Sequence, residues 1–354
     1  RTRVPSSRGR QSWGHRLFER MPLNPTAKLV PNVLDLKALE QKPTRDGYGL
    51  GLVQAGDENS NVVALCADLT ESTRTEAFAK KYPERFVEMG VAEQNMASVA
   101  AGMSLMGKIP YISSYAMFSP GRNWEQIRTT IAYNEANVKI CGAHAGVSVG
   151  PDGATHQAIE DIAITRPIAN MRVFAPCDIW EAQKVTYAIS KVQGPCYVRY
   201  AREKTPVFTT EETPFAIGKA HTVWVEPEGT RPDAAIIACG PLLHNAILAA
   251  AELENAGTKV RVINAVSIKP MDEETIIQAA RDAGCVVTVE EHQVAGGMGS
   301  AVAEVLARSH PVPMEFIGVQ NRFGESGNPA ELVEKFGMGV SHIKAAVQRV
   351  LKRK

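Results

Sequence analysis

The sequence lacks several features that would assign it to a special class of protein. No apolar run approaches the roughly 20 residues that span a bilayer, and no secretory hydrophobic segment follows the first residues. It also has no excess of charge, because 39 basic and 38 acidic side chains give a net charge of +1. Without such an excess, no global field attracts nucleic acid or an acidic membrane. We therefore expect a cytoplasmic protein whose charge-based functions are local.

Cysteine patterns typical of metal sites are absent as well. The six cysteines show no CxxC spacing and no Cys/His cluster, and most stand in or beside apolar, strand-like runs. We interpret them as reduced thiols in the core. The sequence predicts no metal site in this chain.

The first 20 residues contain only one acidic side chain, Glu19, among many arginines and serines. A transit peptide would share this bias. We favour an extension upstream of a natural start at Met21, where more ordinary sequence begins. We therefore predict that residues 1–40 are an N-terminal extension, of which the first 20 are disordered.

What is present is length and regular alternation. A chain of 354 residues with 44% hydrophobic content suffices for two domains. From residue 61 short β-rich runs alternate with helical patterns, as in parallel sheets with right-handed crossovers. The predicted strands are 62–67, 85–89, 109–113, 138–143, 171–175 and 196–200. The helices between them are 93–106, 123–137 and 179–190.

A stretch rich in Thr, Pro and Glu interrupts this alternation, and we interpret residues 206–220 as a linker. A second series follows, with strands 234–239, 259–264 and 285–289 and helices 242–256, 272–283 and 340–351. The sequence therefore predicts an α/β fold with two domains, 41–205 and 221–354. Each is expected to hold a mostly parallel sheet with helices on both faces.

Glu93 stands where a β-rich run meets a helix rich in alanine and glycine. A carboxylate there can simply stabilise the first helical turn through the helix dipole. The pair Tyr115 and Phe118 follows a later strand, at a strand end where open parallel sheets bind ligands, although such a pair can also be core. An acid beside an aromatic wall suits a heteroaromatic cofactor.

A glycine-rich turn after strand 138–143 gathers Asp152 and His156, with His144 just before it. Asp152 can begin an Asx-type turn, and His156 can cap the following helix. A histidine with an ordinary pKa can also move protons during catalysis. Both interpretations can hold together.

Five segments, in this order, resemble the C-terminal half of transketolase. They are Ala67-Asp-Leu-Thr-Glu-Ser72, Ala92-Glu-Gln-Asn-Met96, Ser114-Tyr-Ala-Met-Phe118, Gly150-Pro-Asp-Gly-Ala-Thr-His156-Gln and Tyr197-Val-Arg-Tyr-Ala-Arg202. The resemblance runs from about residue 41 to the end, and implies a pyrimidine-binding domain followed by a transketolase C-terminal domain. Similar segments occur in 1-deoxyxylulose-5-phosphate synthase, so half of that enzyme, or a 2-oxo acid dehydrogenase β subunit, is an alternative. A subunit that only assembles or regulates is the non-enzyme alternative.

The resemblance implies roles for individual residues toward thiamine diphosphate. Glu93 matches the glutamate that hydrogen-bonds the aminopyrimidine ring and promotes the imino form that deprotonates the thiazolium C2. Tyr115 and Phe118 match ring-stacking positions, although Tyr115 replaces a more usual phenylalanine. Asp68 is assigned to the same cofactor-binding set.

It also implies a substrate site. Asp152 and His156 match residues that contact the sugar hydroxyls, and His156 is expected to handle protons. Four further positions match the family residues that bind the phosphate of the acceptor sugar, and their side chains suit a dianion. They are Arg45, Ser72, His144 and Arg202. Arg199, at the end of the same strand as Arg202, is held in reserve.

The Gly-Asp-Gly segment with which the superfamily holds Mg²⁺ is missing. The nearest string, beginning at Gly56, is interpreted as a turn before the first strand, and residues 290–299 lack the spacing of a dinucleotide site. The resemblance thus implies a split transketolase in which an N-terminal subunit binds the diphosphate and Mg²⁺. Two pairs would form a two-fold heterotetramer that transfers a ketol unit from a ketose phosphate to an aldose phosphate in the pentose phosphate pathway.

Overall fold

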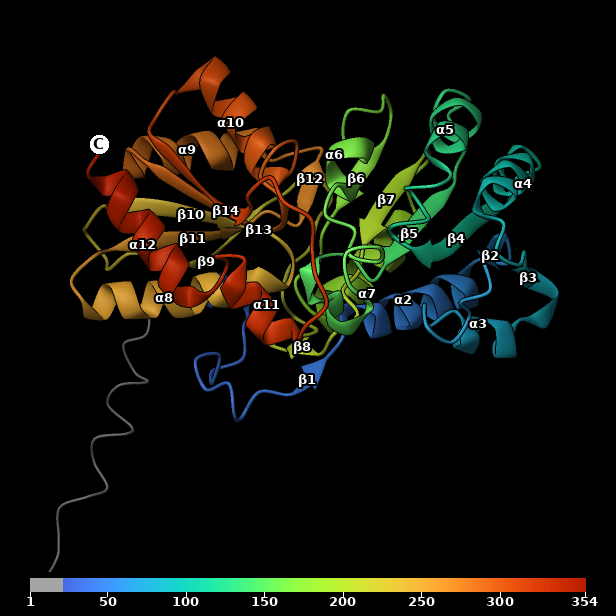
Figure 1. Ribbon diagram of the computed structural model, residues 1–354, viewed down its shortest axis with the longest axis horizontal. Helices are drawn as coiled ribbons and strands as arrows, with labels where there is room; N and C mark the ends of the chain where they lie inside the picture. Colours follow the sequence, from blue (N-terminus) through green and yellow to red (C-terminus); the bar gives the residue numbers. More distant parts are fainter. Residues whose placement is uncertain (1–21) are drawn as a thin grey trace, which may run out of the picture.

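The computed structural model describes residues 22–354 and contains two main sheets that lie side by side (Figure 1). The prediction for the first 20 residues lies outside the described part. All six cysteines are buried and free, as the sequence indicated. The predicted fold class, two domains with mostly parallel sheets and helices on both faces, is confirmed.

The first sheet has seven strands in the order β12-β6-β7-β5-β4-β2-β3, all parallel to their neighbours except β12. The strands are β2 (Val62–Cys66), β3 (Phe86–Glu88), β4 (Ile109–Tyr115), β5 (Lys139–Ala143), β6 (Arg172–Phe174), β7 (Cys196–Arg199) and β12 (Ser267–Lys269). The helices α2 (Thr44–Glu58), α3 (Glu76–Lys81) and α7 (Ile179–Ile189) pack on one face. The other face is covered by α4 (Glu93–Leu105), α5 (Trp124–Gln126) with the π-helix Ile127–Ala132, and α6 (Asp161–Thr165).

The second sheet has five strands in the order β14-β13-β10-β11-β9, of which only β9 is antiparallel. They are β9 (His221–Trp224), β10 (Ala234–Ala238), β11 (Val260–Asn264), β13 (Val286–Gln293) and β14 (Met314–Val319). One face is covered by α9 (Glu273–Ala283) and α10 (Met298–Ser309), the other by α8 (Leu243–Asn255) and α12 (Val340–Leu351), with α11 (Pro329–Lys335) beside them.

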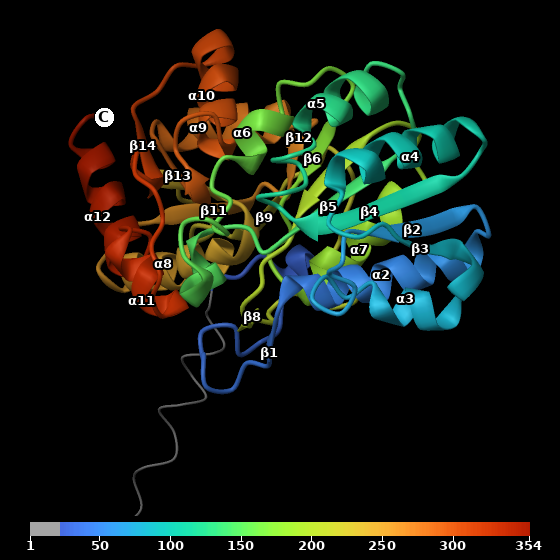
Figure 2. The same ribbon diagram turned by 45° about the vertical axis from the view of Figure 1, so that its right-hand side comes forward.

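The two halves are interlocked rather than merely adjacent. Strand β12 leaves the C-terminal half and pairs with β6 at the edge of the first sheet. In the opposite direction, residues 22–40 pack on the second sheet, where His244 Nε2 lies 2.8 Å from the Val33 carbonyl. The short strands β1 (Gln41–Lys42) and β8 (Thr205–Pro206) pair below the junction (Figure 2). Each half therefore holds part of the other in place.

Helix α2 was not among the sequence predictions, which began the alternation at residue 61. Its glycines lower the intrinsic helix propensity of this segment. In the structure they allow close packing, since a Cβ at Gly51 would lie 2.6 Å from the Gln183 carbonyl oxygen of α7. The prediction that Gly56 opens a turn is therefore wrong, because Gly56 to Glu58 form the end of α2. The predicted helix 123–137 is likewise shorter, and its second part winds as a π-helix.

The strand order places the chemically interesting residues at one edge. Strand β2 lies between β3 and β4 in the sheet, so the chain moves to one side of β2 to form β3 and then to the other side to form β4. Ligands bind at such switch points, outside the carboxyl ends of the strands. Asp68 lies just after β2, Tyr115 is the last residue of β4, and His144 directly follows β5. Glu93 is the first residue of the helix after β3.

Candidate active site

Four predicted rings form one cluster at the carboxyl ends of β4 and β5. Tyr115 stacks on His144 with ring centroids 3.8 Å apart and planes 28° apart. His156, from the glycine-rich turn, lies edge-on to Phe118 with centroids 5.5 Å apart. The structure thus brings residues from three separate segments to one wall.

Glu93 is the first residue of α4, and its side chain is 1% exposed. Its Oε2 accepts a 2.6 Å hydrogen bond from Arg122 Nη1, and its Oε1 accepts one from Ser114 Oγ at 3.2 Å. The Arg122 guanidinium carbon also lies 4.8 Å from the centroid of the Phe118 ring. The carboxylate is therefore linked through a cation to the ring cluster.

Sequence reasoning missed Arg122. No motif or periodicity singles it out, since it lies in a turn between Phe118 and α5. The only available signal was its closeness in sequence to the aromatic pair.

The basic residues of the predicted phosphate set meet beside the rings. Arg45, in the first turn of α2, donates to the Ser72 carbonyl at 2.7 Å, and its Nη1 lies 3.4 Å from His144 Nε2. Arg202 donates to the Val149 carbonyl at 2.7 Å. Its Nη1 also lies 3.8 Å from Asp152 Oδ1, so it ties the phosphate set to the glycine-rich turn.

His144 is neutral in this setting. Burial, together with the positive charges of Arg45 and Arg202, lowers its pKa to about 3. Because the ring is uncharged, Nε2 can accept a hydrogen bond from Arg45. The positive charge of this wall therefore resides on the guanidinium groups, which suit a tetrahedral oxyanion.

The remaining candidates differ in their placement. Arg199 is buried and donates to both oxygens of Asp161, at 2.9 and 3.2 Å, so its charge is neutralised away from the rings. The geometry thus favours Arg202 over Arg199. Asp68 is exposed with φ of 58°, and within residues 22–354 its carboxylate has no hydrogen bond to another candidate. Its backbone N–H donates to Glu88 Oε1 at 2.7 Å.

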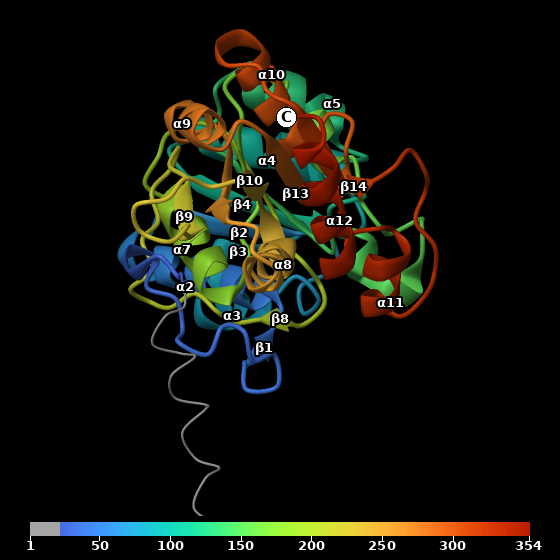
Figure 3. The same cartoon turned by 90° about the vertical axis from the view of Figure 1, so that its left-hand side faces the viewer.

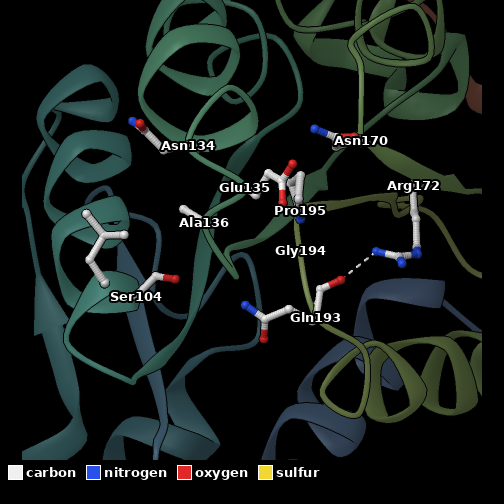
Figure 4. Close-up of a pocket in the computed structure, with 10 residues that line it drawn as sticks. Ser104, Asn134, Glu135, Ala136, Asn170, Arg172, Gln193, Gly194 and Pro195 are labelled. Carbon is white, nitrogen blue, oxygen red and sulfur yellow. Dashed lines mark hydrogen bonds between the residues drawn. The ribbon is translucent and has the colours of Figure 1, made fainter.

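A separate pocket of about 540 Å³ lies at the opposite, amino ends of β5 and β7 (Figure 4). Arg172 points along its wall and donates to the Gln193 carbonyl at 2.7 Å. The ring cluster and Glu93 lie at the other end of the strands. This pocket is therefore not part of the candidate active site.

Both halves of the chain match known protein families. Residues 40–207 match the family "Transketolase, pyrimidine binding domain", and residues 224–343 match "Transketolase, C-terminal domain". The chain belongs to the transketolase family, through its pyrimidine-binding and C-terminal domains.

The chain covers nearly the whole length of some of its relatives. It is 43% identical to the "Putative transketolase C-terminal section" of Methanocaldococcus jannaschii, over 88% of this chain and 97% of that protein. It is 37% identical to the "6-deoxy-6-sulfo-D-fructose transketolase subunit SqwH" of Clostridium sp. (strain MSTE9), over 89% and 97%. A solved structure, "Split gene transketolase, inactive beta4 tetramer", aligns with a TM-score of 0.81 at 43% identity, covering 88% of this chain and 98% of that one.

The chain also matches "Transketolase-like protein 2" of Mus musculus at 39% identity and "Transketolase" of Homo sapiens at 33% identity, over 86% and 91% of this chain. It spans 48% and 51% of the length of these two proteins. The transketolase family implies thiamine diphosphate as cofactor. The buried Glu93 carboxylate beside aromatic faces fits the pyrimidine of that cofactor. By contrast, residues 22–354 contain no group of three His, Cys, Asp or Glu side chains that could hold a metal ion. None of the helices in this part of the chain is both long and apolar enough to cross a bilayer.

Proposed function

We propose that this chain is the C-terminal subunit of a split transketolase, active only with a subunit that binds the cofactor's diphosphate. The proposal is supported by one observation: Glu93, the ring cluster and the guanidinium groups of Arg45 and Arg202 lie together at the carboxyl ends of the strands. An acid for a heteroaromatic ring and cations for an anionic sugar are both required for ketol transfer between sugar phosphates.

The cofactor would supply the carbanion that attacks the ketose. Glu93 would hold a proton at the pyrimidine ring nitrogen, and its burial would keep water from competing for that proton. Phe118 would lie against the ring face, with Tyr115 behind it against His144. Asp68, at the end of β2, is the weakest member of this proposed set, because it is exposed.

The sugar would lie between the two polar groups of the wall. Asp152 and His156 would face its hydroxyls, and His156 would move protons during carbon–carbon cleavage. The anionic end would be bound by Arg45, His144 and Arg202, with Ser72 beside them.

A sulfonated sugar is a second candidate for the anionic substrate. The name of the Clostridium relative refers to 6-deoxy-6-sulfo-D-fructose. A sulfonate is also a tetrahedral oxyanion, and guanidinium groups would hold it in the same way. The assay should therefore offer phosphate and sulfonate sugars in parallel.

We infer that the partner subunit supplies the Mg²⁺ site, and that two pairs of subunits assemble in the cytoplasm around a two-fold axis. Helix α4 supports self-association, because Val99, Leu105 and Met106 expose 36, 69 and 83% of their surface on this helix or just after it. The likeness to a split-gene transketolase that forms an inactive β4 tetramer supports both self-association and dependence on a partner.

The test is co-expression with the candidate diphosphate-binding subunit, followed by assay of ketol transfer from xylulose 5-phosphate to ribose 5-phosphate. Pyruvate serves as the alternative donor, since its use would indicate a deoxyxylulose-phosphate synthase or an oxo acid dehydrogenase. Binding of the partner without any turnover or cofactor binding would indicate a subunit that only assembles or regulates.

A further inference from the structure

The turn that carries Asp152 and His156 makes several direct contacts with the C-terminal half of the chain. This turn, residues 144–157, follows β5 and contains a 3-10 helix, Val147–Asp152. Helix α11 lies beside that 3-10 helix, with the segment before α11 running along it (Figure 3). We call residues 324–329, which run from that segment to the first residue of α11, the C-terminal strap.

Glu291 anchors the first part of the turn. It lies on β13, the second strand of the C-terminal sheet, and is 3% exposed. Its Oε1 accepts a 2.6 Å hydrogen bond from the Ser148 amide, 143 positions away in sequence. The carboxylate also fills the space where a Cβ of Gly146 would lie, so turn and strand are in direct contact.

Gln157 ties the end of the turn to the strap. Its side-chain nitrogen donates to the carbonyls of Val147 and Gly150, at 3.0 and 3.3 Å, and to that of Glu325 at 2.9 Å. The side chain is buried, and a Cβ at Gly324 would overlap its oxygen. One amide therefore joins both ends of the turn to the strap.

The strap also limits the middle of the turn. A Cβ at Gly153 would lie 2.5 Å from Ser326 Oγ, and one at Gly150 would lie 2.9 Å from Pro329 Cγ. Both glycines have positive φ, 75° and 78°, a conformation that other residues rarely adopt. The backbone on either side of Asp152 is therefore fixed by contact with the strap.

We propose that the C-terminal half positions the sugar-binding turn, with Glu291 and the C-terminal strap as its positioning elements. Neither element supplies a charged group to the ring cluster, so their effect passes through the backbone that carries Asp152 and His156. The expected effect on sugar binding rests on the proposed function. The coupling between the turn and the strap rests on the contacts alone.

The test uses the complex with the diphosphate-binding subunit and compares Glu291→Ala with wild type. We expect the KM for the ketose donor to rise about tenfold or more, since a hydrogen bond to a charged acceptor is lost. The affinity for thiamine diphosphate, measured by equilibrium dialysis, should stay within about twofold. Glu291→Gln, which keeps an acceptor for the Ser148 amide, should restore most of the donor affinity.

Glu304→Ala is the matched control. Glu304 of α10 accepts a 3.0 Å hydrogen bond from Arg166 across the same boundary but does not touch the turn. Its donor KM should equal that of wild type. Should Glu291→Ala fail to fold, Gly324→Ala carries the test from the strap side, by displacing Gln157.

Hydrogen exchange of peptides covering residues 144–158 gives a second readout that needs no turnover. Exchange should be faster in Glu291→Ala and Gly324→Ala than in wild type and Glu304→Ala. Wild-type exchange and wild-type donor KM in both variants would overturn the inference while ketol transfer by the wild-type complex stands. If the wild-type complex transfers no ketol unit, the proposed function fails, and the exchange data alone decide the coupling.

Discussion

Arg122 and Glu93 form a direct ion pair at the centre of the site, with 2.6 Å between Nη1 and Oε2. The Glu93 carboxylate is almost fully buried, whereas 46% of the Arg122 side chain is exposed. A buried carboxylate without a partner is costly, so Arg122, together with Ser114, stabilises Glu93 in the isolated chain. Any ligand that forms a hydrogen bond with the Glu93 carboxylate must share that carboxylate with the Arg122 guanidinium.

Replacing Arg122 should therefore destabilise the fold. We expect Arg122→Met to lower the free energy of unfolding by about 1–3 kcal/mol, because the buried Glu93 loses a charged donor. Urea titration of the chain measures this change. Arg128→Met, on the neighbouring π-helix, is the control, since Arg128 is exposed and forms no side-chain hydrogen bond within residues 22–354. Equal stability of the two variants would show that the ion pair contributes nothing.

Replacing Glu93 should affect the cofactor more than the fold. In the complex with the partner subunit, Glu93→Gln should slow proton exchange at the thiazolium C2 by at least about tenfold, because the side chain no longer holds a proton at the pyrimidine nitrogen. NMR of the bound cofactor follows this exchange directly. Glu125→Gln, an exposed residue of α5, should leave it unchanged. Wild-type exchange in Glu93→Gln would remove Glu93 from its proposed role.

How far the sequence alone reaches is shown by these residues. Glu93 and His144 stand at a helix start and a strand end that alternation predicts, and His156 lies in the glycine-rich turn that follows His144. The structure links all three through the ring cluster and Arg122. Arg122 escapes such reasoning because its turn has no periodic signal. Glu291 and Ser148 are 143 positions apart, and nothing in either local pattern indicates that they meet.

The same limit applies to the fold. Hydrophobic runs predict most strands, since buried parallel strands are nearly continuous in apolar residues. Helix α2 was missed because its glycines oppose helix formation locally, while packing against α7 favours it in the fold. Strand β12 was missed because its partner β6 belongs to the other half of the chain.

His144 should contribute to the pH dependence of stability. Its folded pKa of about 3 lies below the ordinary 6.5, so the unfolded chain binds the proton more tightly. The contribution of His144 to the free energy of unfolding is fully present above pH 6.5. It is lost as the pH falls toward 3, by about 1 kcal/mol per pH unit. His144→Phe, which keeps a ring against Tyr115, should show a shallower loss between pH 6.5 and 4.5 in urea titrations. Parallel curves for the two proteins would contradict a neutral His144.

The guanidinium pair should determine affinity for the anionic end of the sugar. Arg45→Gln or Arg202→Gln should raise the KM for ribose 5-phosphate about 10- to 100-fold, as expected for a charge-assisted hydrogen bond. The effect on kcat should be much smaller, since the anionic end is remote from the reacting carbon. A non-phosphorylated aldose should react equally with variant and wild type. Arg172→Gln, in the pocket at the other end of the strands, is the control (Figure 4). An equal loss for the phosphorylated and the non-phosphorylated acceptor would rule out a phosphate site.

In the proposed split enzyme, this chain provides one half of a ketol-transfer site. The most direct measurement is the rate of ketol transfer from xylulose 5-phosphate to ribose 5-phosphate by this chain alone, by the diphosphate-binding subunit alone, and by their mixture with thiamine diphosphate and Mg²⁺. We expect turnover only in the mixture. Turnover by this chain alone, or a stable mixture that binds the cofactor and transfers no ketol unit, would contradict the division of the site between two subunits.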